Sequence, residues 1–368
     1  MFKNLKKTDM IGTNFTSNLF KHNNFIVFYG DFYLDGQFFF PISIKHNAGS
    51  FELFGNLAPI KYRKYFEQDF YNYTLNQKNN MEIIENSLIL GSSGNYYHDL
   101  IDFYSKIFSY DNKIDTNIDK FIIGQSYLKD PIITLIKKIN IQKKLVIINN
   151  ETKIFKNSYF VSNKNFIKIN DFYRHLFLNP NAQQFKNIYI SRNDSKNRSI
   201  KNEKDVVNYL EKFDFEIYEL SKISFLEQIK IFSEAKMIVS MHGAGLTNLM
   251  FCNPETKVVE IAADFYENYK SNNLDIDSKQ FEYFKNNETD WFSDINCNKY
   301  NKFTRSVFNQ LSQMNGLNHY YYFVKSINLK NNKKIIADFE FKTITHTNLT
   351  VDMKIFKSFF QQIFIKKK

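Results

Sequence analysis

The stretch AKMIVSMHGAGLTNLMF, residues 235–251, decides the predicted fold, because it has the pattern of a buried strand, a glycine turn and a short helix. Residues 237–240 form the apolar run that is typical of an inner strand in a parallel sheet. Residues 242–245 (HGAG) follow as the turn at the carboxyl end of that strand. A helix is expected to begin directly after the turn, over residues 246–251.

This turn holds two of the 11 glycines in the chain. Glycine lets backbone amides approach a ligand closely, and the N-terminus of the following helix carries a partial positive charge. The turn therefore predicts an anion site, the alternative being a tight strand-to-helix turn without a ligand. Its spacing matches neither the Walker nor the G-x-G-x-x-G pattern. An esterase oxyanion loop is disfavoured, because no G-x-S-x-G elbow occurs and GSSGN at 91–95 has the wrong spacing.

Strand-like and helix-like segments alternate from residue 83, and the alternation restarts with greater regularity at residue 187. The expected strands are 83–90, 121–125, 144–149, 187–192, 215–220, 237–241 and 257–263. The expected helices are 96–108, 130–139, 170–179, 202–213 and 224–236. Such alternation indicates parallel βαβ units. The sequence therefore predicts an α/β protein with two doubly wound domains that face each other across a cleft.

Three segments are expected: a domain over 1–165 with an aromatic, strand-rich start, a second domain over 166–350, and an amphipathic helix over 351–368. The strand-rich start includes 25–34 and 37–43. In the last segment Ile355, Phe359 and Ile363 have helical spacing, and the chain ends in three lysines. We expect this helix to pack across the domains, including back onto the N-terminal one. The alternative is a helix that lies on an anionic membrane surface.

The formal net charge of +11 favours an anionic partner, namely nucleic acid, an acidic membrane surface or a phosphorylated small molecule, and charge alone does not rank these. The first 20 residues lack the apolar core of a signal peptide, and no window approaches the roughly 18 apolar residues of a membrane span. Cys252 and Cys297 cannot form a disulfide framework and are expected to be inert core thiols. A cytoplasmic protein is predicted.

Two arginines lie upstream of the glycine turn in the same α/β run. Arg192 ends the first strand of the second domain, and Arg198 follows in a polar loop. Loops at the carboxyl ends of parallel strands line the ligand crevice, so these arginines are expected to converge with the turn. Guanidinium groups suit a diphosphate, whereas a solvated charged loop is the alternative for each arginine alone.

The segment 189–261 closely resembles the family 61 glycosyltransferases. The matching residues are Arg192, Arg198, Asn202-Glu203, Glu227-Gln228-Ile229, His242 to Asn248, and Glu260-Ile261. A second patch matches the pattern N-x-[YF]-H-x-x-x-D of the family with Asn95, Tyr97, His98 and Asp102. The resemblance covers about residues 95–261, and the first 80 and last 100 residues carry none of these motifs.

The resemblance implies a GT-B architecture of two Rossmann-like domains, in which the first is on the acceptor side and the second holds the donor. It also implies inverting transfer of a sugar from a nucleotide sugar, with UDP as the expected nucleotide. Charge develops on the departing diphosphate, so the expected diphosphate site consists of Arg192, Arg198, His242, the backbone amides of Gly243, Ala244, Gly245 and Leu246, and Thr247. Glu260 and Asn248 are expected to bind the nucleoside.

Inversion requires a base that removes the proton of the acceptor. His98 and Asp102 are four residues apart on one expected helix face, so both reach the same cleft. Asp102 is the favoured base, with His98 binding phosphate or substrate, and the reverse assignment stays open. A core histidine and a surface aspartate are the alternative without function.

No cofactor and no obligatory metal are predicted. The letters D-x-D occur at Asp275 and Asp277, in a loop rich in Asn, Asp and Ser where chance explains them. The expected partners are a nucleotide sugar, a glycan or lipid-linked saccharide acceptor and an anionic membrane surface beside the basic C-terminus, and no nucleic acid.

The predicted function is a glycosyltransferase of capsule or lipopolysaccharide assembly, cytoplasmic or peripheral at the inner face of the membrane. A non-catalytic scaffold with the same fold and a eukaryotic-type protein O-glycan transferase are the alternatives.

Overall fold

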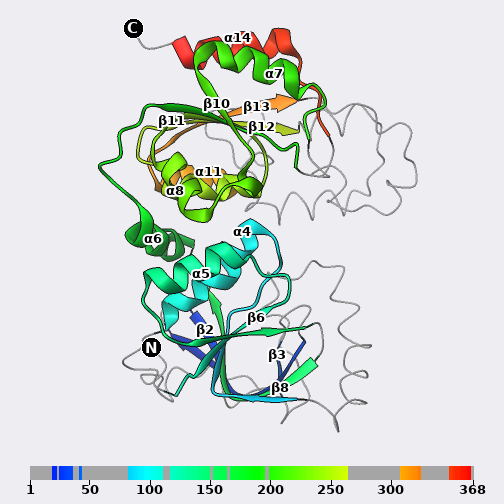
Figure 1. Ribbon diagram of the computed structural model, residues 1–368, viewed down its shortest axis with the longest axis vertical. Coiled ribbons are helices and arrows are strands. Elements are labelled where there is room, and N and C mark those ends of the chain that lie inside the picture. Colours follow the sequence, from blue (N-terminus) through cyan, green and yellow to red (C-terminus); the bar gives the residue numbers. More distant parts are fainter. Residues whose placement is uncertain are drawn as a thin grey trace, which may run out of the picture. The chain divides into compact units, whose positions relative to one another are not determined.

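The computed structural model describes residues 19–22, 25–35, 41–43, 82–110, 117–149, 152–163, 166–194, 199–263, 307–324 and 348–365. The chain divides into two compact units, Met1–Phe172 and Tyr173–Lys368 (Figure 1). Each unit contains a sheet with parallel strands and helices beside it. The predicted α/β class is therefore confirmed, and the parallel sheets are consistent with Rossmann-like units.

The first unit is built on a mixed sheet with the strand order β1-β2-β8-β5-β6-β7. Strands β5, β6, β7 and β8 pair in parallel, whereas β2 pairs with β8 and with β1 in the antiparallel sense. The strands are β1 (Leu19–His22), β2 (Phe25–Asp35), β3 (Pro41–Ser43), β4 (Ile83–Glu85), β5 (Ser87–Ile89), β6 (Lys120–Gly124), β7 (Lys144–Ile148) and β8 (Thr152–Asn163).

Two sequence predictions in this unit need correction. The expected strand 83–90 is interrupted at Asn86, where φ is 53°. The expected regular helix 96–108 is instead a short α-helix, α4 (Tyr96–His98), then a π-helical turn, η5 (Asp99–Phe103), and a 3₁₀-helix, η6 (Tyr104–Ser109). The apolar period alone does not reveal such changes of winding, because each of these stretches is too short to show a period of its own.

The helix α5 (Lys129–Lys138) was predicted correctly, and β8 was missed. Polar residues interrupt the apolar pattern of β8. Its position is set by partners distant in sequence, since it pairs with β2 along nearly its whole length and with β5 on the other side. The helix α6 (Phe166–Phe177) spans the boundary between the units.

The second unit contains an all-parallel sheet with the order β10-β9-β11-β12-β13. Its strands are β9 (Lys186–Ile190), β10 (Phe215–Tyr218), β11 (Ala235–Met241), β12 (Lys257–Ala263) and β13 (Asn318–Val324). β9 is the first strand of this unit in the sequence, and it has β10 on one side and β11 on the other. The winding direction therefore reverses between β9 and β11, and open α/β sheets bind ligands at such a position.

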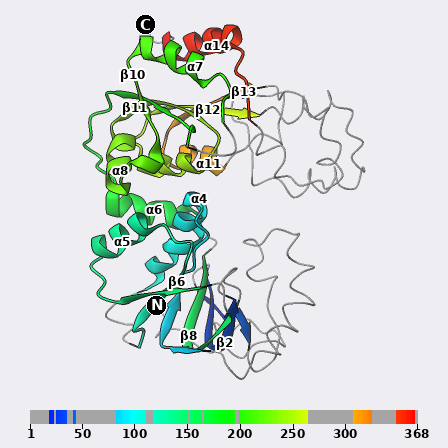
Figure 2. The same cartoon turned by 45° about the vertical axis from the view of Figure 1, so that its right-hand side comes forward.

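Helices cover both faces of this sheet (Figures 1 and 2). The helices α7 (Glu203–Leu210) and α14 (Met353–Ile365) lie on one face. On the other face lie α8 (Phe225–Ser233), α11 (Val307–Met314) and the 3₁₀-helix η9 (Ala244–Phe251). Ser224 caps α8 by accepting a hydrogen bond from the Glu227 amide, and Phe225 is the first buried residue of this helix. Short 3₁₀-helices are η7 (Glu211–Phe213) and η8 (Leu220–Lys222).

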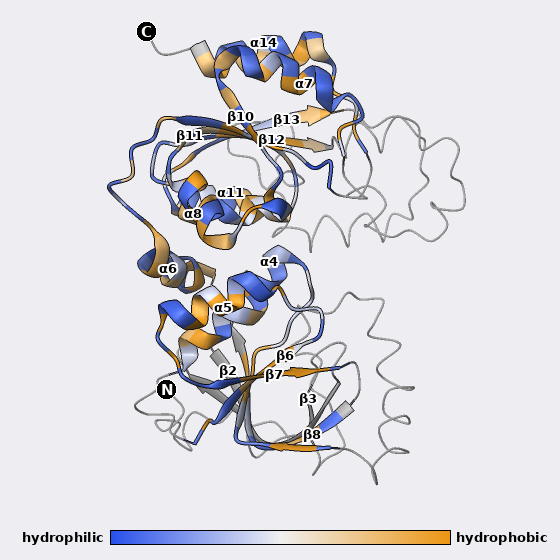
Figure 3. Ribbon diagram, in the orientation of Figure 1, coloured by the Kyte–Doolittle hydropathy of each residue, from blue (hydrophilic) through white to orange (hydrophobic). Residues whose placement is uncertain are grey.

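The C-terminal helix α14 closes the core of the second unit. Figure 3 shows that apolar and polar residues alternate along it. Phe356, Phe360 and Ile363 are buried against the sheet and α7, while Ile355 is 59% exposed. Of the predicted stripe, Ile363 is buried, Phe359 is partly buried and Ile355 is exposed, and the buried face of α14 packs against the core of the second unit. The predicted packing onto the N-terminal domain stays a prediction.

Hydrogen bonds hold both ends of this helix. The Asn202 side-chain amide donates to the Val351 carbonyl and accepts from the Val351 amide, both at 2.9 Å. At the other end Lys257 Nζ donates to the Ile363 carbonyl at 2.7 Å. Within the described residues no helix is long and apolar enough to cross a membrane.

The substitution Phe360→Ala is expected to lower the free energy of unfolding by about 3–5 kcal/mol. Phe360 is fully buried and its ring lies 5.2–5.8 Å from the rings of Phe213, Tyr209 and Phe215. Urea denaturation measures the loss. Ile355→Ala on the exposed face of the same helix is the control and is expected to have little effect; equal losses in the two variants would contradict the packing described.

Candidate functional site

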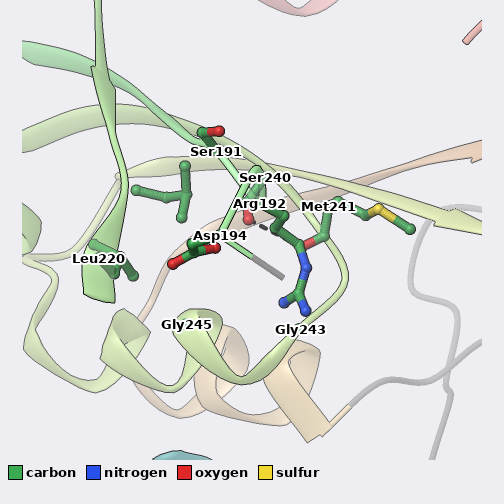
Figure 4. Close-up of a pocket in the computed structure, with 9 residues that line it drawn as sticks. Ser191, Arg192, Asp194, Leu220, Ser240, Met241, Gly243 and Gly245 are labelled. Carbon is green, nitrogen blue, oxygen red and sulfur yellow. Dashed lines mark hydrogen bonds between the residues drawn. The ribbon is translucent and has the colours of Figure 1, made fainter. Parts of the chain in front are cut away.

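A pocket of about 260 Å³ lies at the carboxyl ends of β9 and β11 (Figure 4). This is the position between β9 and β11 at which the winding of the sheet reverses. The residues that line it are Ile190, Ser191, Arg192, Asp194, Leu220, Ser240, Met241, Gly243 and Gly245. The pocket therefore brings together the predicted arginine loop and the predicted glycine turn, which are 50 residues apart in the sequence.

Arg192 and Gly243 are in close contact in this pocket. Figure 4 shows the Arg192 side chain extending toward Gly243. A Cβ atom on Gly243 would lie 1.8 Å from Nη1 of Arg192, so the guanidinium takes this place only because residue 243 has no side chain. Burial lowers the pKa of Arg192, and the charges of Asp194 and Glu203 oppose that effect. The guanidinium remains a cation and gives the pocket a donor for an anionic ligand.

Glu203 holds the backbone beside this arginine. Its Oε1 accepts a hydrogen bond from the Arg192 amide at 3.3 Å and another from the Tyr189 hydroxyl at 2.8 Å. Glu203 is buried at the start of α7, where the helix dipole favours a carboxylate. The carboxylate of Asp194 also lines the pocket, but it is exposed to solvent, which screens its charge.

The glycine turn differs from its prediction in how the helix begins. The helix η9 is a 3₁₀-helix that starts at Ala244, and no α-helix begins at Leu246. The Leu246 amide donates to the Gly243 carbonyl at 3.0 Å, so this amide is used within the turn. Of the four amides predicted to bind a diphosphate, those of Gly243, Ala244 and Gly245 come before Leu246, at the start of the 3₁₀-helix, and these three remain candidates for that role.

The rest of the motif is buried and holds η9 in place. Thr247 and Asn248 are fully buried. Asn248 Nδ2 donates to Oε1 of Gln228 at 2.9 Å, and the Gln228 amide donates to the carbonyls of Leu220 and Ile223. The predicted contacts of Thr247 and Asn248 with the donor are therefore corrected, because both side chains face the protein interior.

His242 and Glu260 belong to a chain of buried hydrogen bonds. His242 Nδ1 lies 2.5 Å from Glu260 Oε1, and His319 Nε2 lies 2.9 Å from Glu260 Oε2. Ser312 Oγ lies 2.8 Å from His319 Nδ1. Burial alone raises the pKa of Glu260, but the hydrogen bonds from both histidines outweigh it and bring this pKa to about 2. Glu260 is thus an ionised carboxylate in the interior.

This arrangement corrects the predicted role of Glu260. Its carboxylate is fully buried and both oxygens accept hydrogen bonds from histidines, so the geometry does not support contact with a ribose. His242 does not line the pocket, although its neighbours Met241 and Gly243 do. Sequence reasoning missed Ser312 and His319, because they lie on α11 and β13, beyond the segment that carries the family motifs.

In the first unit the structure joins the predicted pair His98 and Asp102. His98 Nδ1 lies 2.6 Å from Asp102 Oδ2, and the side chains are 41% and 20% exposed. Asn95 caps α4 by accepting hydrogen bonds from the amides of Tyr97 and His98. The π-helical winding of η5 begins directly after His98, in the segment that carries Asp102. This pair is a partly exposed imidazole with a carboxylate behind it.

Lys106 lies fully buried next to this segment. Its Nζ donates to the Leu90 carbonyl at 2.7 Å, and it lies 5.0 Å and 4.6 Å from the ring centroids of Phe103 and Phe160. Burial lowers the pKa of Lys106 to about 7, against the opposing charge of Asp102. Sequence analysis did not single out this lysine, because the apolar pattern of residues 96–108 does not reveal that a lysine is buried there.

Several predicted residues are outside the described part of the chain, namely Arg198, Asp275, Asp277 and Cys297. Cys252 is buried, and burial raises the pKa of its thiol, as expected for an inert core cysteine. Within the described residues no group of three or more His, Cys, Asp or Glu side chains is placed to hold a metal ion. The expectation of no obligatory metal stays a prediction.

Comparisons with known proteins agree with the motifs. Residues 96–259 match the family described as Glycosyltransferase 61, so the resemblance predicted from the sequence is confirmed over somewhat less than half of the chain. A stretch of 40 residues is 45% identical to Beta-1,2-xylosyltransferase RCN11 of Oryza sativa subsp. japonica. That stretch is 11% of this chain and 8% of the length of the rice protein.

The substitution Gly243→Ala is expected to weaken binding of inorganic pyrophosphate by about tenfold or more, because the new methyl group displaces the Arg192 guanidinium. Isothermal titration calorimetry measures the affinity. The double variant Gly243→Ala with Arg192→Ala is expected to bind no more weakly than Arg192→Ala alone, since both changes remove the same contact. Additive losses would contradict this explanation.

Lys106 predicts a pH dependence of stability. An unfolded chain holds the lysine proton up to a pKa of about 10.4, whereas the folded chain loses it near pH 7. Between these values the unfolded chain binds more protons, so the free energy of unfolding rises with pH. Relative to Lys106→Met, the wild type is expected to gain about 2 kcal/mol between pH 7 and pH 9.

Urea denaturation at both pH values measures this gain. Lys138→Met, which removes an exposed lysine of the same unit, is the control and is compared with the wild type in the same way. A difference between wild type and Lys106→Met that stays constant from pH 7 to pH 9 would show that Lys106 does not titrate as described.

Proposed function

We propose that this protein transfers a sugar from a nucleotide-sugar donor to a glycan acceptor. Two findings support the proposal: the match of residues 96–259 to Glycosyltransferase 61, and the pocket of the second unit at the reversal point of its sheet. The observation that carries it is the Arg192 guanidinium over Gly243 inside this pocket.

The proposed role of the pocket is to bind the diphosphate of the donor. Negative charge grows on the phosphate oxygens as the sugar departs, and a positioned cation with backbone amides stabilises that charge. Removing one such donor typically lowers the rate by about 10²–10³. Arg192, Arg198 and the amides at the start of η9 are the proposed donors, with UDP as the proposed nucleotide.

The proposed base belongs to the pair His98 and Asp102. The hydrogen bond joins Nδ1 of His98 to the carboxylate, and the imidazole is the more exposed group. A carboxylate behind a histidine orients the ring and leaves Nε2 for proton transfer. This geometry favours His98 as the base and Asp102 as the residue that orients it, the reverse of the assignment preferred from the sequence.

The finer features form part of the same proposal. We propose a GT-B enzyme that inverts the anomeric configuration and needs no metal. The proposed acceptor is a glycan or lipid-linked saccharide of capsule or lipopolysaccharide assembly, at the cytoplasmic face of a membrane whose anionic surface is a proposed partner. The name of the rice relative adds xylose to the donors that should be tested.

A product assay with a panel of nucleotide sugars, together with UDP titration, tests the function. We expect UDP binding and mass-spectrometric detection of one glycosylated product, with no loss of turnover in EDTA. Absence of binding by any nucleotide to the wild type would contradict the proposal. Donor binding without any turnover across acceptors would instead favour a non-catalytic scaffold.

The assignment of the base predicts the effect of substitutions at both residues. Asp102→Asn and His98→Gln should both lose turnover by about 10²-fold or more while UDP affinity is unchanged. The loss should be larger in His98→Gln, because this change removes the base itself, whereas Asp102→Asn removes only the group that orients it. A larger loss of turnover in Asp102→Asn than in His98→Gln would restore Asp102 as the base.

A further inference from the structure

We infer that Glu260, His319 and Ser312 are positioning residues for the glycine turn, which they hold through a buried hydrogen-bond chain ending on His242. The inference rests on the proposed function, since the turn is the proposed diphosphate site. It assigns a role in that site to α11 and β13, which lie beyond residues 96–259 that match the family.

The chain connects four side chains from separate elements. Ser312 is on α11, His319 on β13, Glu260 on β12, and His242 follows β11 directly. The successive distances are 2.8, 2.9 and 2.5 Å. The first three side chains are fully buried, whereas the His242 side chain is 18% exposed. The hydrogen bonds therefore connect the protein interior with the turn after β11, whose residue Gly243 lines the pocket.

The charge of Glu260 decides which nitrogen atoms carry protons. An ionised carboxylate only accepts hydrogen bonds, so both histidines must donate to it. His242 consequently carries a proton on Nδ1, and His319 carries one on Nε2. Neither proton position is required by the histidines alone, because either ring nitrogen of an imidazole can hold the proton.

The last link fixes the glycine turn. His242 is held twice, by the side-chain bond to Glu260 and by its backbone amide, which donates to the Ile261 carbonyl at 2.9 Å. Its ring also packs against Phe308 of α11, at 5.3 Å between centroids. Gly243 follows immediately, and the Arg192 guanidinium lies against it. Because glycine has little conformational preference of its own, the position of this residue depends on the anchor before it.

Breaking the chain has a defined cost. Without His319, Glu260 would remain a buried carboxylate with one fewer hydrogen bond, which is strongly unfavourable in an interior. The carboxylate would then move or take up a proton, and either response changes its bond to His242. The turn would lose its side-chain anchor while the sheet and the pocket lining stay chemically unchanged.

The proton positions are tested first, in the wild-type protein without ligand. Selective ¹⁵N labelling of histidine gives few signals, because the chain has seven histidines, and single His→Gln substitutions assign them. The expected spectra show a proton on Nδ1 of His242 and on Nε2 of His319. A ring nitrogen without a proton at either position could not donate a hydrogen bond to Glu260, and this result would overturn the inference.

The functional consequence is tested by UDP titration. His319→Leu is expected to weaken UDP binding roughly tenfold, and His319→Gln, whose amide can still donate to Glu260, is expected to restore most of the affinity. Tyr320→Leu is the matched control, because Tyr320 lies on the same strand as His319 but takes no part in the hydrogen bonds to Glu260. Its UDP affinity is expected to stay within about twofold of the wild type. Equal affinities of His319→Leu and wild type would overturn the positioning role.

The two proposals fail in different ways. If the wild type does not bind UDP, the proposed function fails. The histidine spectra still report whether the hydrogen bonds from His242 and His319 to Glu260 are present. If the wild type binds UDP and His319→Leu binds it equally well, the proposed function stands and the positioning role is wrong. Thermal denaturation of each variant, with the midpoint compared to wild type, separates loss of the fold from loss of the anchor.

Discussion

The buried carboxylate of Glu260 is the interaction on which the second unit depends. An isolated charge in a protein interior costs several kcal/mol, and hydrogen bonds from His242 and His319 offset that cost here. These bonds connect β12 with β13 and with the turn after β11. The parallel strands β12 and β13 and the turn after β11 are thus joined by side chains as well as by the backbone ladder.

The pocket follows from this arrangement and from the order of the strands. Reversal of the winding between β9 and β11 leaves an opening at their carboxyl ends, and Arg192 and Gly243 meet there. Gly245 of the motif also lines it, whereas Gln228 and Asn248 do not. Gln228 and Asn248 bond to each other in the interior and hold η9 against α8. The family motif therefore combines residues that line the pocket with buried residues that hold the neighbouring helices together.

Much of this fold could be predicted from the sequence, because local patterns of apolar residues indicate where its strands and helices lie. The apolar run before the glycine turn and the alternation of strands and helices identified β9 to β12 and most helices. The strand β13 was missed, and the predicted buried face of α14 was right at Ile363 but wrong at Ile355. Ile355 and Phe356 are adjacent apolar residues, and only contact with Tyr209 and Tyr322 decides which one is buried.

By itself, the sequence determined the α/β class, the glycine turn after the inner strand β11 and the spacing that places His98 beside Asp102. These depend on spacing along the chain, which sets strand, turn and helix face. Only the tertiary structure decided that Glu260 faces two histidines and that the Arg192 guanidinium occupies the place of a side chain at Gly243. Both facts depend on side chains brought together from distant strands, and the distance between such side chains is a property of the folded sheet.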